Sequence, residues 1–512
     1  MKFEARGIVK VFPAPVFSGG QPLRALGGLY LEAGPGVLGV EGPNGSGKTT
    51  LFKTLAGIIE SDGGTILAGG ETSGAQRLRE LAAYCPASPR AFYFRLSALE
   101  NLRFFGALAG LSTWQALERA RQLADKLGFS ATDLERRFYR LSEGNMQKVS
   151  LIRSFSRRPP LLLLDEPFRS LDKTSCRGLL ELITETGRDS AVLISSHSPE
   201  LLRAASKKIL RLEAGRITSE PPRSSSFSAP PLSPHPPSFS LNLSSFSIIS
   251  AFLRRDFLTE RSYRLSFALG ALATLANLAV FYFIGRLFGG ALAPQLEPYG
   301  TGYFTYVFTA MAFFGYIGTG AGSYSGRLRL EQTQGTLEAA LSTPLKTIPF
   351  LAAMSAWNFL FATFELLVYA LAGIFIFRLD FSAANWPAAA LVFILSAACF
   401  AALGILSSCF VVLFKRGNPL AWALNNFEGL LGGVYFPVAV LPGWLAAVSN
   451  LLPVTYAVRA FQLAMHKGAG PAAISHDLFI LTVFNIVLIP ASIWFFSLSV
   501  NRARKTGTLG EY

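Results

Sequence analysis

The alternation of apolar and polar residues divides the chain at about residue 218. Before that point, short apolar runs (36–40, 161–164 and 191–194) are separated by stretches with helical periodicity. Such runs predict the buried strands of a largely parallel sheet wrapped by helices, so residues 1–218 are expected to form an α/β domain. Residues 1–10 already alternate like a first strand, and we therefore expect no signal peptide.

The composition changes twice after this domain. Residues 219–245 are rich in serine and proline, which predicts an extended linker, and residues 246–264 predict an amphipathic connecting helix. Residues 265–505 are predominantly apolar and predict an all-α membrane domain with about six spans. The predicted spans lie near 265–288, 303–323, 350–377, 386–414, 420–440 and 478–500.

Basic residues set the expected orientation of these spans. Arginine and lysine gather before the first span, after the last, and in the loops behind the second and fourth. By the positive-inside rule, both chain ends and the front domain face the cytoplasm. We therefore expect a multi-pass protein of the cytoplasmic (inner) membrane, with basic residues in contact with anionic lipid.

The overall composition excludes some other classes of protein. Apolar residues make up 51% of the chain and charged residues 15%, which excludes intrinsic disorder. The net charge of +15 is not gathered into a strong basic block, which argues against a nucleic-acid partner. Cys85, Cys176, Cys399 and Cys409 lack the spacing of a metal site or a disulfide framework, so we expect structural thiols in a reducing compartment.

A phosphate-binding loop is predicted at residues 42–49, between a strand-like run and a helical one. Its glycines let backbone N–H groups turn toward the phosphates, and the helix N-terminus adds partial positive charge. Lys48 would reach the β- and γ-phosphates of ATP, and the Thr49 hydroxyl would bind Mg²⁺. The expected ATP-binding residues of this loop are Gly42, Asn44, Gly45, Ser46, Gly47, Lys48, Thr49 and Thr50.

Asp165 and Glu166 directly follow the four-leucine run. We expect Asp165 to bind Mg²⁺ together with Thr49, and Glu166 to act as the general base on an attacking water. An Asp-Glu pair alone is more often a solvated strand end. The phosphate loop in the same chain favours catalysis.

Residues 1–218 resemble the ATP-binding cassette (ABC) family of ATPases. Residues 141–145 are similar to the family's signature, with Ser142 and Gly144 at matching positions, while Glu143 and Asn145 replace the commoner Gly and Gln. In the family, the signature of one subunit closes over ATP held by the phosphate loop of another. The chain has one loop and one signature, so the resemblance implies a dimer, either of this chain or with a related half-transporter.

The resemblance assigns three further residues. Asp172 lies in the loop after the second catalytic strand, and His197 matches the histidine that contacts the γ-phosphate. Phe12 falls where the family stacks an aromatic ring on adenine. A structural role for His197 and a core position for Phe12 are the alternatives.

One position departs from the family pattern. A glutamine usually follows the strand near residues 84–86, where it serves the metal and senses the membrane partner, but here Ala87 and Ser88 occupy the neighbourhood. This predicts unusual coupling or slow hydrolysis. Because Lys48, Asp165 and the other catalytic positions are present, we still expect an active ATPase.

The apolar half resembles the type-2 ABC exporter permeases. Residues 331–344 are similar to their cytoplasmic segment between the second and third spans, which implies coupling roles for Glu331, Gly335 and Glu338. A surface amphipathic helix is the alternative. Residues 432–456 resemble the permeases' external hairpin after the fifth span, where non-helical backbone must lie against protein or a water-filled cavity.

Glu428, beside Asn425, falls inside a predicted span. Ionisable groups there tend to face an interior cavity, so both are candidates for a transport pathway. Hydrogen bonding between helices is the alternative. Taken together, these patterns predict a half-size exporter that uses ATP and Mg²⁺, with its ATPase ahead of its permease. A force-transducing or regulatory ABC subunit that moves no substrate remains the alternative, and the cargo does not follow from the sequence.

Overall fold

A computed structural model describes residues 1–13, 21–89, 91–218, 244–262, 294–414 and 429–508, together with residues 276, 279, 280, 282–284, 422 and 427. Most of the predicted linker and of the first predicted span lies outside the described residues, as do Glu428 and Asn425. The chain divides into two compact units. The first comprises Met1–Arg255, Glu331–Phe350 and Asn501–Tyr512, and the second comprises Asp256–Leu330 and Leu351–Val500.

The first unit is built on a six-stranded, largely parallel sheet with the strand order β10-β9-β3-β8-β7-β6. Its central strands are apolar on both faces, and all four residues of β7 are buried. This confirms the predicted α/β fold, since parallel strands covered on both faces are continuously hydrophobic. The strands are β3 (Gly36–Glu41), β6 (Ala82–Cys85), β7 (Leu161–Leu164), β8 (Ala191–Ser195), β9 (Lys208–Glu213) and β10 (Arg216–Ile217).

A second, antiparallel sheet with the order β2-β1-β4-β5 completes this unit. The sequence pattern predicted its first strand but not the separate sheet. Its apolar face shares a core with the parallel sheet, including Phe3, Ile8, Leu26 and Phe52. The strands are β1 (Phe3–Phe12), β2 (Leu23–Ala33), β4 (Gly63–Ala68) and β5 (Glu71–Thr72).

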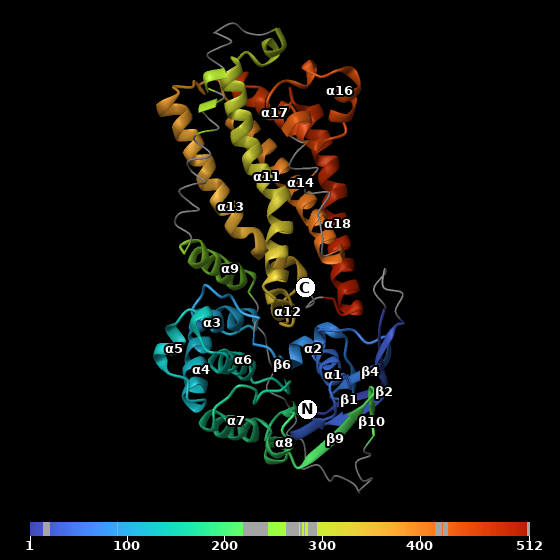
Figure 1. The fold of residues 1–512 in the computed structure, drawn as a ribbon. Helices are drawn as coiled ribbons and strands as arrows, with labels where there is room; N and C mark the ends of the chain where they lie inside the picture. The colour runs from blue at the N-terminus through green and yellow to red at the C-terminus, as the bar shows by residue number, and fades with distance from the viewer. Residues whose placement is uncertain are drawn as a thin grey trace. The chain divides into compact units, whose positions relative to one another are not determined.

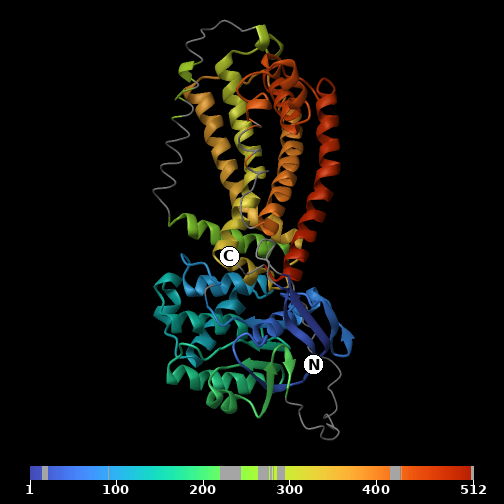
Figure 2. The ribbon, with the colours of Figure 1, turned by 45° about the vertical axis from the view of Figure 1, so that its right-hand side comes forward.

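Helices cover the parallel sheet, and several of them begin at a polar cap. Figures 1 and 2 show α3 to α7 gathered together, apart from β1, β2 and β4. The side chains of Ser142 and Asp172 accept hydrogen bonds at the starts of α6 and α7. The helices are α1 (Lys48–Leu55), α2 (Ala75–Leu81), α3 (Ala98–Leu108), α4 (Thr113–Lys126), α5 (Ala131–Glu135), α6 (Glu143–Ser156), α7 (Lys173–Thr186) and α8 (Pro199–Ala205).

Segments distant in the sequence join the first unit. They are most of α9 (Ser245–Glu260), the short helix α12 (Thr336–Leu341) and the C-terminal end of α18 (Ser475–Thr506). The unit boundaries therefore do not follow the linear division predicted from composition, because residues 331–350 and 501–512 fold with residues 1–218, called the cassette below.

The second unit consists of long helices, which Figures 1 and 2 show as a bundle. Among the described residues, three segments are long and apolar enough to cross a membrane: Thr347–Ile376, Trp386–Phe414 and Ser475–Thr506. Helix α11 (Tyr303–Thr333) covers the predicted second span, but its glycines and hydroxyl side chains keep it outside that set. The remaining helices are α13 (Thr347–Leu371), α14 (Trp386–Phe414), α16 (Gly443–Ser449) and α17 (Pro453–His466).

Candidate functional site

A cavity of about 970 Å³ in the first unit collects most of the residues expected to bind or hydrolyse ATP. It opens at the carboxyl ends of β3, β7 and β8, the edge where parallel α/β sheets bind ligands. The expected residues that line it are Phe12, Asn44, Gly45, Ser46, Gly47, Lys48, Thr49, Thr50, Asp165, Glu166 and His197.

The phosphate loop has the backbone geometry that its glycines permit. Gly45 and Gly47 have φ of +78° and +105°, a region that other residues rarely adopt. A Cβ atom at Gly47 would lie 2.5 Å from the Ala25 carbonyl oxygen. Lys48 starts α1, and its Nζ folds back to donate to the carbonyl oxygens of Gly42 (2.7 Å) and Pro43 (3.0 Å). The loop thus gathers a helix N-terminus and an ammonium at the cavity wall, a combination that binds anions.

Asp165 is held by three hydroxyl groups. Thr49 Oγ1 donates to its Oδ2 at 2.6 Å, and Tyr84 donates to the same oxygen at 3.2 Å. Ser195 Oγ donates to Oδ1 at 2.7 Å. Burial, reinforced by Asp165, raises the pKa of Tyr84, which therefore stays a protonated donor. Sequence reasoning missed Tyr84 and Ser195, because each meets Asp165 only through the pairing of β6, β7 and β8.

The oxygens at this point fit Mg²⁺. A threonine hydroxyl and a carboxylate, 2.6 Å apart at the cavity wall, are hard donors of the kind that Mg²⁺ prefers. One or two such protein ligands suffice, since Mg²⁺ usually completes its shell with water and phosphate oxygens.

Glu166 is held in an uncommon backbone conformation, with φ of +49°. Its N–H donates to Ser195 Oγ (3.0 Å), and its Oε2 accepts from the His197 N–H (3.0 Å). Its other oxygen, Oε1, is buried with no hydrogen-bond partner among the described residues and lies 3.7 Å from His197 Nε2. A fixed carboxylate with one oxygen unpaired among the described residues, in a cavity lined by the predicted phosphate loop, is suited to accept a proton from water.

The signature residues lie outside this cavity's lining. Ser142 Oγ accepts from the Asn145 N–H at 3.2 Å, and a Cβ atom at Gly144 would lie 2.4 Å from the Ser170 carbonyl oxygen. Asp172 accepts from the Ser175 N–H at 2.8 Å, and this hydrogen bond is the main reason that its pKa falls to about 2. Ser142 and Asp172 cap α6 and α7, Gly144 lies in the first turn of α6, and none of the three lines the cavity.

Ala87 lines the cavity, in the neighbourhood where the resembled family usually has a glutamine, whereas Ser88 is not among the lining residues. An alanine methyl group offers no ligand to a metal ion and no hydrogen bond to water. Replacement of the family's glutamine by Ala87 therefore leaves the cavity without a polar side chain at this point.

One of the predicted coupling residues, Glu338, meets α1. Glu338 Oε1 of α12 lies 2.7 Å from Lys53 Nζ of α1, the helix that begins with Lys48. Gln76 Nε2 of α2 donates to the Pro344 carbonyl oxygen at 3.0 Å. Gly335 starts α12 with φ of +71°, which turns the chain between α11 and α12.

Glu331 belongs to a buried polar cluster. Its Oε1 lies 2.6 Å from Arg255 of α9, and its Oε2 accepts from Tyr93 at 2.8 Å and from Thr336. The Arg255 and Glu331 side chains are only 2% and 6% exposed. Sequence reasoning missed Arg255 and Tyr93 as partners, because neither carries a local motif.

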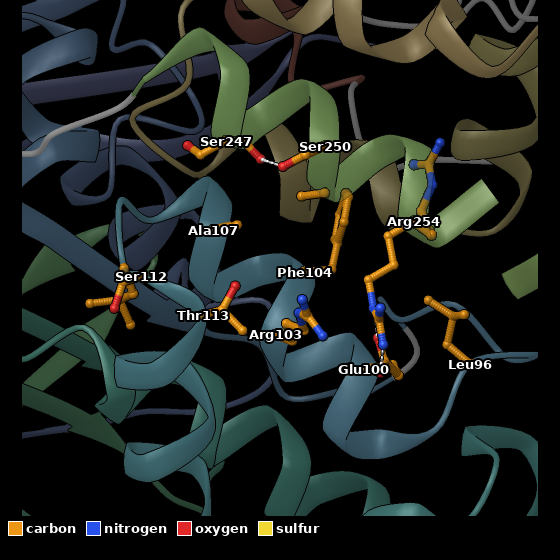
Figure 3. A pocket seen from close by; sticks show the side chains of 13 residues that line it. Leu96, Glu100, Arg103, Phe104, Ala107, Ser112, Thr113, Ser247, Ser250 and Arg254 are labelled. Atoms are coloured by element: carbon orange, nitrogen blue, oxygen red, sulfur yellow. Dashed lines mark hydrogen bonds and ion pairs between the residues drawn. The ribbon is translucent and has the colours of Figure 1, made fainter. Parts of the chain in front are cut away.

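A smaller cavity, of about 160 Å³, lies between α3 and α9 next to this cluster. Figure 3 shows Arg254 pointing along it toward Glu100, with which it forms hydrogen bonds of 3.0 and 2.9 Å. Together with the buried cluster, this pair attaches α9 to the cassette.

Comparison with protein families finds two matches in this order. Residues 29–169 match the ABC transporter family model, and residues 248–466 match that of the ABC-2 type transporter. The chain is 31% identical to the ABC transporter ATP-binding protein NatA of Bacillus subtilis (strain 168), over 37% of this chain and 77% of that protein.

Other relatives are named for different cargoes. The ergothioneine transport ATP-binding protein EgtV of Helicobacter pylori (strain G27) is 32% identical over 36% of this chain and 88% of its own length. The phosphonates import ATP-binding protein PhnC of Hyphomonas neptunium (strain ATCC 15444) is 31% identical, over 39% and 81%. A solved ATP-binding subunit of an ABC transporter shares 26% identity over 43% of this chain and 89% of that one, with a TM-score of 0.37.

Proposed function

This chain belongs to the ABC transporter family, with an ATPase domain ahead of an ABC-2 type membrane domain, and we propose that it works as a dimeric ATP-driven exporter. The observation that carries the proposal is the ion pair between Lys53 and Glu338. It connects the helix of the phosphate loop to the segment that precedes the candidate span Thr347–Ile376.

ATP would bind in the large cavity. The loop N–H groups and Lys48 would hold the phosphates, and Phe12 would stack on the adenine. Thr49 and Asp165 would hold Mg²⁺, which neutralises charge on the phosphate oxygens when bound. Glu166 would take a proton from the attacking water at Oε1, and His197 would contact the γ-phosphate.

A second copy would complete each site. Ser142, Gly144 and Asp172 lie outside the cavity of their own copy, so their proposed ATP contacts require another subunit. Donors from both sides would stabilise the charge that develops on the phosphoryl group, and closure would exclude water. A pair of identical chains is favoured over a related half-transporter, because every main catalytic position is present in this one.

Closure would act on the membrane domain through α12 and α9. Movement of α1 would reach α12 through Lys53 and Glu338, while the Arg255–Glu331 pair would keep α9 and the start of this segment together. Such coupling requires that the two arrangements differ in nucleotide affinity. Glu428 and Asn425 are proposed to face the pathway, with the cassette in the cytoplasm beneath the cell membrane.

Purified protein in lipid nanodiscs tests the proposal. We expect vanadate-sensitive ATP hydrolysis that Glu166→Gln abolishes without loss of ATP binding. Hydrolysis that persists in Glu166→Gln would contradict the assigned base. Negligible hydrolysis by the wild type would favour the regulatory alternative suggested by Ala87.

The direction of transport is tested separately, in inside-out membrane vesicles with a fluorescent amphipathic dye and a labelled phospholipid as probes. We expect ATP-dependent accumulation of a probe in the lumen, abolished in Glu166→Gln and weakened in Glu428→Gln. Uptake in the opposite direction would contradict export. ATP hydrolysis without movement of either probe would favour a force transducer.

A further inference from the structure

A buried lysine binds the C-terminal end of α18 to the first unit. Lys10 lies on β1, and its side chain is 0% exposed. Its Nζ donates to the Glu60 carbonyl oxygen at 2.8 Å, to Asp62 Oδ1 at 3.1 Å and to the carbonyl oxygen of Lys505. An ammonium group has three N–H donors, so the carbonyl from α18 completes its hydrogen bonding. Without that carbonyl, a buried charged donor would lose a partner, which is unfavourable.

The end of α18 has a conformation that leaves this carbonyl available. Thr508 N donates to the Ala503 carbonyl oxygen at 3.0 Å, and Gly507 N donates to that of Arg504 at 3.4 Å. This is the Schellman arrangement, with Gly507 at φ +72°. The neighbouring carbonyl of Lys505 accepts from Lys10, and the negative end of the helix dipole favours a cation there.

The same segment touches a residue of the ATP cavity. A Cβ atom at Gly507 would lie 2.4 Å from Cε1 of Phe12, so the glycine backbone lies directly against the ring. Phe12 also lines the large cavity, and its ring centroid is 5.6 Å from Lys10 Nζ. One aromatic ring therefore contacts the end of α18 and borders the space proposed for adenine.

Docking also carries an unfavourable contact, between Arg504 and Arg79. Burial, and then the charge of Arg504, lowers the pKa of Arg79 to about 9. The Nε atoms of both arginines are buried without a hydrogen-bond partner among the described residues. Docking of this segment therefore includes a repulsion between these two arginines as well as the hydrogen bonds that Lys10 donates.

We infer that Lys10 is a positioning residue that holds residues 503–508 against Phe12, so that docking of this segment and ATP binding favour each other. A ring held by Gly507 is already placed for adenine, and bound adenine in turn holds the ring against Gly507. Such coupling is reciprocal by thermodynamic necessity. The inference rests on the proposed place of adenine at Phe12 and is independent of the cargo. It gives the cassette a second connection to a candidate span, through α18.

The test uses full-length protein in nanodiscs and two variants that act from opposite sides. Lys10→Met removes the ammonium. Gly507→Ala strains the end of α18, where φ is +72°, and places a methyl group against Phe12 without replacing any residue of the cassette. Lys505→Ala is the matched control, because it removes the same charge as Lys10→Met but keeps the carbonyl. Hydrogen exchange of the C-terminal peptide reports docking, and the KM for ATP reports nucleotide affinity.

We expect faster exchange in both docking variants and a KM for ATP raised at least about fivefold, with kcat within about twofold of wild type. Lys505→Ala should behave as wild type, and ATP should slow the exchange of the wild-type C-terminal peptide. Unchanged exchange in both variants, or released segments with an unchanged KM, would overturn the inference while leaving the ATPase assignment intact. Absence of ATP hydrolysis in the wild type would instead count against the proposed function.

Discussion

Glu338 of α12 and Lys53 of α1 form an ion pair of 2.7 Å, with side chains only 17% and 23% exposed. Lys53 follows Lys48 by five residues on one short helix, which is about 7.5 Å along its axis. We therefore propose that a displacement of the phosphate loop would reach α12 through one short helix and one ion pair. It is one connection between the large cavity and the segment expected to couple.

Neutralising Glu338 should remove the conformational response of α12 to ATP. In Glu338→Gln, we expect hydrogen exchange in residues 331–344 to lose its response to ATP, while ATP hydrolysis falls by less than about fivefold, since a part-exposed ion pair contributes about 1 kcal/mol or less. The double variant Lys53→Glu/Glu338→Lys should recover the response. An ATP response in Glu338→Gln equal to that of wild type would show that coupling takes another route.

Removing one partner of the buried Arg255–Glu331 pair should destabilise the protein strongly. Arg255→Met leaves the Glu331 carboxylate buried with only hydroxyl partners, and we expect a loss of about 3–5 kcal/mol. Thermal unfolding measures the loss, and Arg255→Met/Glu331→Leu should recover most of it. The matched control is Arg254→Met, whose pair with Glu100 is more exposed and should contribute less than about 1 kcal/mol. Equal effects of the two single variants would contradict the importance of burial.

The sequence predicted what local patterns encode. The phosphate loop, Asp165 and Glu166 belong to contiguous motifs at strand ends, and the structure brings them together with His197 in one cavity. Their partners could not be predicted in the same way. Tyr93 and Glu331 are 238 residues apart and meet only because residues 331–350 fold with the first unit.

In the membrane half, too, local patterns predicted the helices but not the contacts between them. Continuous apolar runs predicted α13, α14 and α18, which are long and apolar enough to span a membrane. Helix α11 contains polar residues and glycines, whose roles a hydropathy pattern does not reveal. The role of one glycine is clear from the packing: a Cβ atom at Gly404 of α14 would lie 2.0 Å from the carbonyl oxygen of Gly320 in α11. Glycine there permits close packing of α11 and α14 rather than contact with lipid.

Asp172 should contribute stability over a defined pH range. Its folded-state pKa of about 2 lies below the ordinary 3.8, so its contribution is present above pH 3.8 and is lost as the pH falls toward 2. Asp172→Ala removes the cap of α7, and we expect a loss of about 0.5–1 kcal/mol, because the carboxylate is exposed. Thermal unfolding should show the same deficit at pH 5 and pH 8. A deficit that disappears between those values would contradict this assignment.

Restoring an amide at the cavity should accelerate hydrolysis. Ala87 lines the cavity without a polar side-chain atom, so Ala87→Gln adds a group able to bind the metal or orient water. One added hydrogen bond of about 1 kcal/mol in the transition state would raise kcat roughly fivefold. Ser88→Gln, at a position outside the lining, should leave kcat unchanged. A larger gain in kcat from Ser88→Gln than from Ala87→Gln would show that Ser88, rather than Ala87, corresponds to the glutamine of the family.

We propose that ATP brings two copies of the cassette together. Pulsed electron spin resonance measures the distance between the copies, with a spin label at Glu135→Cys, an exposed position on α5, in a Glu166→Gln and Cys176→Ser background in nanodiscs. With saturating Mg-ATP we predict a single, narrow distance between the labels of the two copies, replacing a broad distribution seen without nucleotide. The same distribution with and without ATP would contradict the claim.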